Sequence, residues 1–303
     1  MTERTAPPTV IFATPRKLPK PSTVHGRVVV LDIAFAADGT GHSFEKVTAP
    51  FLKGLGDRLA AWVDHHDHAL HASFRDDPRF VLATKAVHGA CPEMVTPELV
   101  ARIGRVDTIV CHTDLDGLYA AARWILGGRD PYPGAEADAR AVDTRIGEPS
   151  PRATALDRAL RLRGRDETFL ARVVRMLIGR DDDGAITDEV RDAAREYAEV
   201  ENNTKRLADT GYIAHGDVVV CDATNVPPRE FDKTDLLLLG QTRARVSIVL
   251  DAQNVTLAAA FDSGLNFLTL LGVSGGMPTR VSVPRSRYDE VRKALSTAAL
   301  WRD

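Results

Sequence analysis

Histidines and aspartates gather in two short stretches of the first half of the chain. In chain order they are Asp64, His65, His66, His112, Asp114 and Asp116. Carboxylates and imidazoles are the ligands that suit manganese, iron, cobalt or zinc, and no cysteine stands beside them to argue for a structural zinc site. These residue types therefore predict a divalent metal site, for which manganese or a similar ion fits best.

The second stretch reads His112-Thr113-Asp114-Leu115-Asp116-Gly117. Its three polar side chains alternate, so along an extended strand end they project to one side and into one crevice. Gly117 is expected to let the chain turn from the strand into the following helix.

A third contributor stands upstream at Asp32, directly after the apolar run 28–31. Continuous apolar runs of this length are typical of buried parallel strands. The runs 60–63 and 106–111 end in the same way, in acidic or histidine residues. Because ligands gather beside the carboxyl ends of strands in doubly wound α/β sheets, we expect one site to collect all three.

Several carboxylates crowded in one pocket repel one another unless cations neutralise them. A pair of divalent metal ions does so, and it also activates water and clamps a phosphoryl oxygen. Hydrolysis of a phosphate ester or anhydride is the natural chemistry of such a site, with a neighbouring histidine available to hold the phosphate.

These motifs resemble the DHH phosphoesterase superfamily, which includes RecJ-type exonucleases, nano-RNases, cyclic dinucleotide phosphodiesterases and manganese pyrophosphatases. The acidic loop of that family is similar to the stretch from His112 to Asp116, its lone strand-end aspartate to Asp32, and its name-giving triplet to Asp64-His65-His66. The resemblance implies a centre of two divalent metal ions, most suitably Mn²⁺, bridged by Asp32.

The resemblance also implies individual roles. Asp114 and His112 would bind one ion, and Asp116 with His65 would bind the other. His66 would face the substrate phosphate. Asp64 would be either a metal ligand or a group that orients a histidine, a role that metal sites commonly require.

The order of the motifs departs from the family, in which the acidic loop comes first. The chain therefore looks circularly permuted, and permutation preserves a fold whose original termini lie close together. The family's fourth motif, a single aspartate, has two candidates: Asp143 and the run Asp181-Asp182-Asp183.

The chain divides by composition and pattern into four parts. They are a proline-rich, flexible N-terminal tail at 1–27, a mainly parallel α/β metal-binding domain at 28–150, a helical linker at 151–210 and a smaller α/β substrate-binding domain at 211–303. A helix is expected near 92–103 with Pro92 in its first turn. In the last part, the runs 217–221, 236–239, 245–250 and 255–261 are predicted to be strands, with a closing helix at 288–300.

The second domain resembles the family's substrate-binding module, in which a glycine-rich turn with a histidine meets the nucleotide. This chain has Ser274-Gly275-Gly276-Met277-Pro278 there, without the histidine. Gly275 and Gly276 are the expected substrate contacts in this turn, and Arg280 on the following strand is expected to pair with a phosphate.

Composition excludes several classes of protein. Of 303 residues, 44% are hydrophobic and 27% charged, and no apolar run is long enough to cross a bilayer, so we expect no membrane partner. A net charge of -3 argues against stable binding of duplex nucleic acid. The N-terminus lacks the pattern of a secretion signal, and the three cysteines are too far apart for a disulfide framework, so a cytoplasmic location is expected.

The expected function is that of a metal-dependent phosphoesterase that hydrolyses a phosphodiester in a small nucleotide or short oligonucleotide with a water activated by two metal ions. One alternative is a pyrophosphatase or a phosphomonoesterase acting on a small phosphorylated metabolite. Another is a catalytically silent, nucleotide-binding sensor. A homodimer is compatible with the sequence.

Overall fold

A computed structural model describes residues 7–37, 42–180, 184–273 and 277–302 of the chain. The chain forms two compact units. Unit 1 comprises Met1–Ala36 and Phe44–Arg195, and unit 2 comprises Ala37–Ser43 and Glu196–Asp303. The long helix α7 (Ala185–Gly211) spans the division, so the predicted helical linker belongs to unit 1 up to Arg195.

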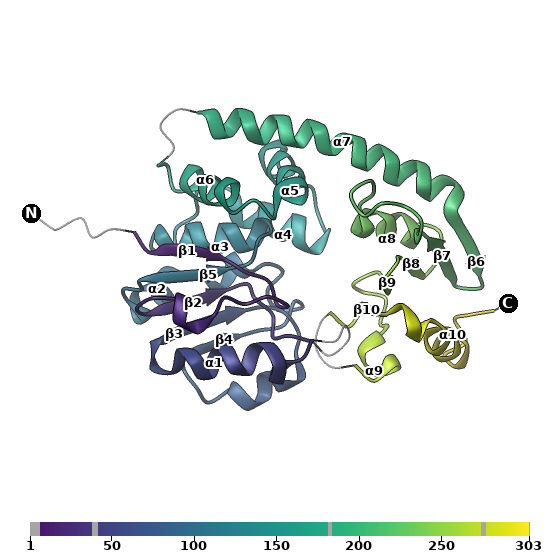
Figure 1. Cartoon of the computed structure of the whole chain (residues 1–303), viewed down its shortest axis with the longest axis horizontal. Coiled ribbons are helices and arrows are strands. Elements are labelled where there is room, and N and C mark those ends of the chain that lie inside the picture. The colour runs from purple at the N-terminus through teal and green to yellow at the C-terminus, as the bar shows by residue number, and fades with distance from the viewer. Residues whose placement is uncertain (1–6, 38–41, 181–183, 274–276, 303) are drawn as a thin grey trace, which may run out of the picture. The chain divides into compact units, whose positions relative to one another are not determined.

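Unit 1 is built on a five-stranded sheet whose paired strands all run parallel (Figure 1). Its strands are β1 (Thr9–Phe12), β2 (Val28–Leu31), β3 (Leu59–Asp64), β4 (Phe80–Leu82) and β5 (Thr108–Cys111), in the spatial order β1-β5-β2-β3-β4. The predicted α/β class with a mainly parallel sheet is confirmed.

Both faces of this sheet are buried, which explains why its central strands are continuous apolar runs. Val28 and Val30 pack with Phe51 of α1 (Ala49–Leu55) on one face. Val29 and Leu31 pack on the other face, against α2 (Pro97–Ile103) and α3 (Leu115–Ile125). The strands are thus held between helices, and only their ends are free to carry polar side chains.

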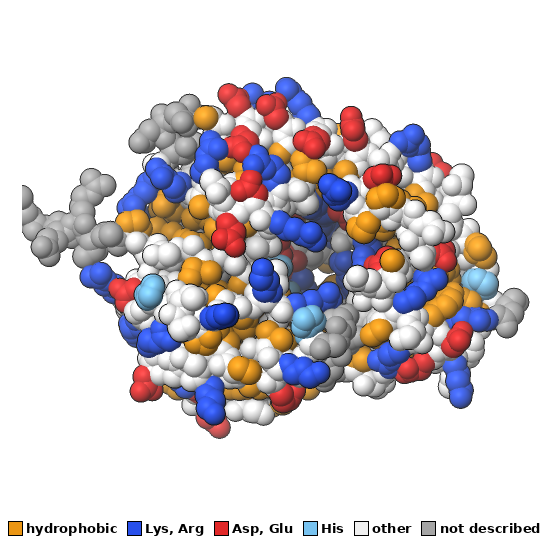
Figure 2. All heavy atoms as spheres, viewed as in Figure 1, with side chains coloured by type: hydrophobic (Ala, Val, Ile, Leu, Met, Phe, Trp, Pro, Cys, Tyr) orange, Lys and Arg blue, Asp and Glu red, His pale blue; other side chains and the backbone are white. Residues whose placement is uncertain are grey.

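A helical layer extends the core of unit 1 beyond α3. It comprises α4 (Ala135–Thr144), α5 (Pro151–Arg163), α6 (Glu167–Leu177) and the first part of α7. The stripe predicted through Phe169, Val173, Val174 and Leu177 is buried, and it packs within this layer. Acidic and basic side chains alternate along the outer face of α7 (Figure 2), as suits a helix with one solvated side.

The N-terminal segment differs from the flexible tail predicted for 1–27. Thr9–Phe12 form the edge strand β1, which pairs with β5 from Thr9↔Thr108 to Phe12↔Cys111. Val10 and Phe12 pack against the helices on one face of the sheet. The prediction was wrong for this stretch because four apolar-rich residues between prolines are too short to show a periodic pattern.

Prolines lie at the starts of two helices of unit 1, and one of these helices begins later than predicted. Pro92 lies in a short 3-10 turn (Cys91–Met94), and the α-helix begins later, at Pro97, where the side chain of Thr96 accepts a hydrogen bond from the Leu99 amide. Pro97 has no amide hydrogen to continue a helix from the preceding turn, so it starts a new one. Pro50 likewise lies in the first turn of α1, after a π-helical turn (Phe44–Thr48).

Unit 2 has a second five-stranded sheet, of mixed direction. Its strands are β6 (Tyr212–His215), β7 (Val218–Asp222), β8 (Val246–Leu250), β9 (Asn254–Ala259) and β10 (Arg280–Pro284), in the order β10-β9-β8-β7-β6. Among these described strands, β7 pairs with β8 in parallel and the other neighbouring pairs are antiparallel. The sheet is covered by α8 (Lys233–Gln241) on one face and by α9 (Phe267–Leu271) and α10 (Tyr288–Thr297) on the other.

The strand predicted at 236–239 is wrong, since these leucines lie in α8. Asp232 caps this helix by accepting a hydrogen bond from the Asp235 amide, and Leu236 and Leu237 are buried. A short apolar run is compatible with either a buried strand or a buried helix. Here the cap at Asp232 favours the helix, because it satisfies an amide at the helix start. In the described part of the chain, no helix has both the length and the apolar character needed to cross a membrane.

Candidate metal centre

The three predicted motifs meet at the middle of the unit 1 sheet. β5, β2 and β3 are spatial neighbours, and their carboxyl ends carry His112, Asp32 and Asp64 respectively. The chain reverses its direction of strand addition between β2 and β5, and at such a point the helices on the two sides leave a crevice. Three distant segments of the sequence therefore reach one place.

The side chains at these strand ends form three overlapping groups that could each hold a metal ion, with ligand atoms within 4.8 Å of one another. The groups are Asp32 with His65 and His66, Asp32 with His112 and Asp114, and His65 with Asp116 and Asp143. Because Asp32 and His65 each belong to two groups, the three merge into one cluster.

Asp32 turns its two carboxylate oxygens toward different partners. Oδ1 lies 3.2 Å from Nε2 of His65, whereas Oδ2 lies 3.6 Å from Nδ1 of His112. The backbone of Asp32 has a φ of 58°, in the left-handed region that aspartate tolerates better than most residues. This conformation ends β2 and leaves a buried carboxylate between two sets of candidate ligands.

The acidic loop places its aspartates at the start of α3. Asp114 caps the helix through Oδ1, which accepts a hydrogen bond from the Gly117 amide at 3.3 Å, and its Oδ2 lies 2.6 Å from Nδ1 of His112. Asp116 is buried in the first turn. Gly117 lies inside the helix, and a Cβ there would stand 2.8 Å from the backbone of His112. A glycine is therefore required at position 117 because the helix packs closely against His112. The turn from strand to helix that was predicted for Gly117 does not lie at this residue.

His65 is oriented by the loop that follows β4. Its Nδ1 lies 2.9 Å from the carbonyl oxygen of His88, so Nδ1 carries the hydrogen and donates it. Nε2 then faces the aspartates, 3.4 Å from Asp116 Oδ2 and 3.6 Å from Asp143 Oδ2. A backbone carbonyl that sets the tautomer in this way is typical of histidines that bind metals.

Asp64 contacts a histidine instead of joining a ligand group. Its Oδ1 accepts a hydrogen bond from Nδ1 of His66 at 2.8 Å, and its Oδ2 lies 4.0 Å from Nε2 of His71. Within the described residues, Asp64 is a member of none of the three groups. This contact with His66 matches the second of the two roles expected for Asp64, which is to orient a histidine.

Asp143, on α4, is one of the two candidates for the fourth motif, and it joins the cluster. The other candidate, Asp181-Asp182-Asp183, lies outside the described residues, as do Gly275 and Gly276. Lys85 also reaches the cluster, with Nζ 2.6 Å from Asp143 Oδ2 and only 7% of its side chain exposed. Lys85 was not predicted from the sequence because a lone lysine in a loop carries no local signal.

Negative charge dominates the buried cluster. Burial and the nearby Asp116 and Asp114 raise the pKa of Asp32 to about 7. Burial alone would lower the pKa of His65, but Asp116 and Asp32 raise it to about 12. Both raised pKa values favour the protonated forms of Asp32 and His65. Without cations, the centre therefore compensates its carboxylates by binding protons.

Unpartnered atoms show what would fit the centre. Among the described residues, both carboxylate oxygens of Asp32, Oδ2 of Asp64 and Nε2 of His65 are buried without a hydrogen-bond partner. Such atoms destabilise a fold unless a ligand or ion satisfies them. Oxygen and imidazole donors suit a divalent cation of the manganese, iron or zinc type. Burial raises the pKa of the neighbouring Cys91 and Cys111 thiols, so neither offers a thiolate.

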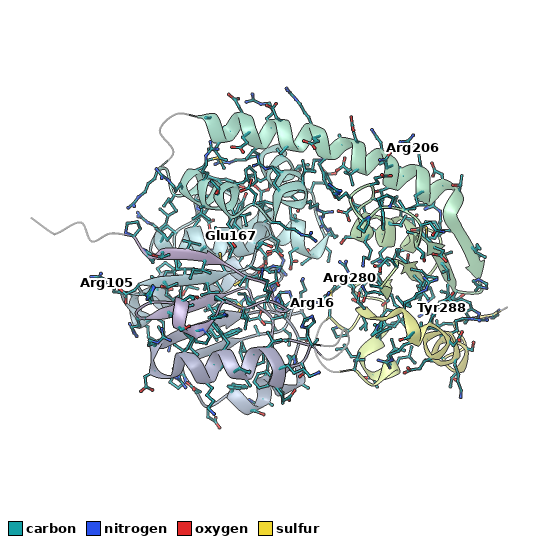
Figure 3. The ribbon with its side chains drawn as sticks, viewed as in Figure 1. Arg16, Arg105, Glu167, Arg206, Arg280 and Tyr288 are labelled. Atoms are coloured by element: carbon teal, nitrogen blue, oxygen red, sulfur yellow. The ribbon has the colours of Figure 1, made fainter. Side chains whose placement is uncertain are left out.

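Arg280, the remaining predicted substrate contact, begins β10 in unit 2 (Figure 3). Its guanidinium donates a hydrogen bond to Oγ1 of Thr234 at 2.9 Å. Thr234 lies in the first turn of α8. Arg280 is thus anchored within its own unit.

No known family model and no curated protein matches the sequence. The solved structures to which the chain is similar at low identity include the three that follow. The pGpG-specific phosphodiesterase PggH from Vibrio cholerae has a TM-score of 0.45 and 14% identity, over 90% of this chain and 98% of that one. The exonuclease RecJ bound to manganese has a TM-score of 0.47 and 11% identity, over 91% and 76%.

The third is the DHH domain of a member of a family of ribosomal proteins, with a TM-score of 0.44 and 12% identity over 91% of this chain and 70% of that one. These likenesses concern the fold alone.

Proposed function

We propose that the protein is a metal-dependent phosphoesterase that hydrolyses a phosphodiester in a small nucleotide or short oligonucleotide. The observation that carries this proposal is the merged cluster, in which Asp32 and His65 are each shared between groups of candidate ligands. A shared carboxylate is what two neighbouring cations need to be held side by side. Asp32, His112 and Asp114 would hold one ion, and His65, Asp116 and Asp143, with the second oxygen of Asp32, would hold the other.

Two bound divalent ions would polarise a phosphoryl oxygen and activate water to attack phosphorus, so that the bond from phosphorus to the leaving ester oxygen breaks. The rest of the centre supports the same reaction through the side chains themselves. Burial of His65 and Asp32 keeps bulk water from the ligands, so their charges act at short range in a medium of low polarity.

His66 is the best candidate for a group that meets the phosphate. Its Nδ1 is held by Asp64, which leaves Nε2 as the atom available to a substrate oxygen. Burial opposes protonation, but Asp64 more than compensates and raises the pKa of His66. A protonated imidazole held in this way donates a charge-assisted hydrogen bond to a phosphate oxygen or to the leaving group.

The test is hydrolysis of bis(4-nitrophenyl) phosphate by purified protein after chelation and reloading with manganese. We expect activity that depends on added metal and falls by at least about 100-fold in His65→Ala and in Asp114→Asn. Asp192→Asn, which changes an aspartate that is 74% exposed on α7, is the matched control and should leave the rate unchanged. Full activity in either cluster variant would overturn the proposal.

A substrate panel separates the expected function from its rivals. Turnover of pyrophosphate or of a phosphomonoester in preference to the diester would make the protein a pyrophosphatase or phosphomonoesterase with the same centre. Tight nucleotide binding without hydrolysis under several metals would identify a sensor. The net charge of -3 favours a small or single-stranded substrate over duplex nucleic acid.

A further inference from the structure

Lys85 is a buried ammonium at the edge of the metal centre. Its side chain is 7% exposed, and it forms an ion pair with Oδ2 of Asp143, 2.6 Å away. An ammonium has three N–H donors, and taking it out of water is costly unless anions surround it. Lysines are rarely buried to this degree, so a specific partner must compensate its charge.

The oxygen that holds Lys85 is also the oxygen that faces the candidate ligands. Asp143 Oδ2 lies 3.6 Å from Nε2 of His65, in the group that also contains Asp116. A divalent ion held by this group would meet the ammonium of Lys85 on the same oxygen. Two cations at one carboxylate oxygen repel each other strongly in a buried site.

The charge of Lys85 is also felt at His66, the residue proposed to meet the phosphate. Burial lowers the pKa of His66, Asp64 raises it, and Lys85 opposes that rise. Its charge acts as well on Asp116 and Asp32, since both help to raise its own pKa against the effect of burial. The ammonium therefore stands within the field of both the ligands and the phosphate-binding histidine.

We propose that Lys85 is an oxyanion-binding residue of the centre, held on Asp143 while the metal is absent and released to a phosphate oxygen when metal and substrate are bound. This proposal rests on the phosphoesterase function proposed above. Release from Asp143 would leave a buried cation in need of an anion, and the substrate phosphate is the anion that the proposed reaction brings to this place. A charge-assisted contact to a phosphate oxygen would then stabilise both bound substrate and transition state.

A purely orienting role for Lys85 predicts the opposite effect on metal binding. If Lys85 only held Asp143 in place for the ion, the loss of Lys85 would lower the affinity for the metal ion by about 10- to 100-fold, as is usual for groups that orient ligands. If the ion must displace Lys85, its loss removes a competing cation and leaves the cluster more negative. Metal affinity then rises.

The first experiment measures manganese binding to the 303-residue chain by titration calorimetry without substrate. For Lys85→Met we expect binding roughly tenfold tighter than in the wild type, because the ion pair no longer has to be broken. Lys53→Met, which removes an exposed lysine of α1, is the matched control and should bind manganese as the wild type does. Weaker manganese binding by Lys85→Met would overturn the proposal.

The second experiment measures inorganic phosphate as an inhibitor of the manganese-loaded protein. Lys85→Met should raise the inhibition constant of phosphate by about tenfold and lower kcat/KM for the diester by about 100-fold, whereas Lys85→Arg should recover part of both. Unchanged phosphate inhibition in Lys85→Met would overturn the proposal. Lys85→Gln, which keeps a neutral donor for Asp143, should show the same changes as Lys85→Met and serves if that variant does not fold.

The two proposals fail in different ways. If the wild type neither binds manganese nor hydrolyses the diester, the phosphoesterase function falls and the role of Lys85 falls with it. If the wild type does both, and Lys85→Met weakens metal binding or leaves phosphate inhibition unchanged, only the role of Lys85 is lost.

Discussion

Asp32 shows how a single side chain can join two halves of a centre. It is 1% exposed, its pKa is raised to about 7 by burial and by Asp116 and Asp114, and its two oxygens face His65 and His112. A buried carboxylate without hydrogen bonds would be costly in a protein of no metal chemistry. The cations proposed for this centre would compensate that cost.

At the residue scale, Asp143→Asn tests which aspartate completes the centre. We expect manganese affinity to fall by at least about tenfold, because one of the two carboxylates of a candidate group is replaced by a neutral amide. Titration calorimetry of the metal-free protein measures this, with Asp192→Asn as the control. Wild-type affinity in Asp143→Asn would instead direct attention to Asp181-Asp182-Asp183 as the fourth motif.

Asp64→Asn separates the two roles expected for Asp64. Because Asp64 holds Nδ1 of His66, its neutralisation should lower kcat by roughly 100-fold while manganese affinity stays near that of the wild type. Calorimetry and steady-state kinetics on the same preparation give both values. A collapse of metal affinity would mean that Asp64 is itself a ligand.

At the element scale, α4 must be held firmly for Asp143 to reach the cluster. Asp138, on the same helix, is buried and accepts hydrogen bonds from the hydroxyl of Tyr132 at 2.7 Å and from the backbone and side chain of Ser150, both at 2.6 Å. Tyr132 in turn lies 2.6 Å, oxygen to oxygen, from the buried Tyr119 of α3. This network ties α4 to α3, the helix that carries Asp116, and to the start of α5.

Tyr132→Phe is expected to lower the free energy of unfolding of unit 1 by about 1 to 3 kcal/mol, since the buried hydroxyl of Tyr119 loses its partner. Urea unfolding followed by tryptophan fluorescence in a Trp301→Phe background measures this, because Trp62 and Trp124 then report on unit 1 alone. Tyr288→Phe, on α10 of unit 2, is the control. An unchanged unfolding midpoint would mean that the network contributes nothing to the stability of unit 1.

Elements also explain which predictions about the fold were right. The buried strands β2, β3 and β5 follow from apolar runs that end in polar residues, and these positions were predicted from the sequence. β1 and α8 were not, since a four-residue strand and a run of leucines carry no period that separates helix from strand. Their structure depends on neighbours, namely β5 for β1 and the Asp232 cap for α8.

At the scale of the whole molecule, the candidate ligands all lie in unit 1. An ion that binds only the folded state stabilises it by mass action, by about 2.7 kcal/mol at 100 times its dissociation constant. Manganese should therefore raise the melting temperature of the Trp301→Phe protein followed by fluorescence, and a chelator should reverse the rise. Asp143→Asn should shrink this shift, and a melting temperature indifferent to manganese would contradict the metal centre.

The residues that gather at the strand ends could be predicted from the sequence alone, whereas their roles as metal ligands stay predictions. Asp32, the triplet from Asp64 to His66 and the loop from His112 to Asp116 follow apolar runs, and a strand end is a local feature that short stretches of sequence encode. The circular order of the motifs and the roles of Gly275, Gly276 and Arg280 stay predictions.

Only the tertiary structure decided how these parts meet. The spatial order β5-β2-β3 brings strand ends together that are up to 80 positions apart in the sequence, from Asp32 to His112. Asp143 and Lys85 reach the cluster from a helix and a loop. The sequence named Asp143 only as one of two candidates and did not mark Lys85, because the positions of both depend on how α4 and the loop after β4 pack. The types of the candidate ligands are a local property of the sequence. Which side chains lie beside each of them depends on strand order and helix packing, and these are set by the whole fold.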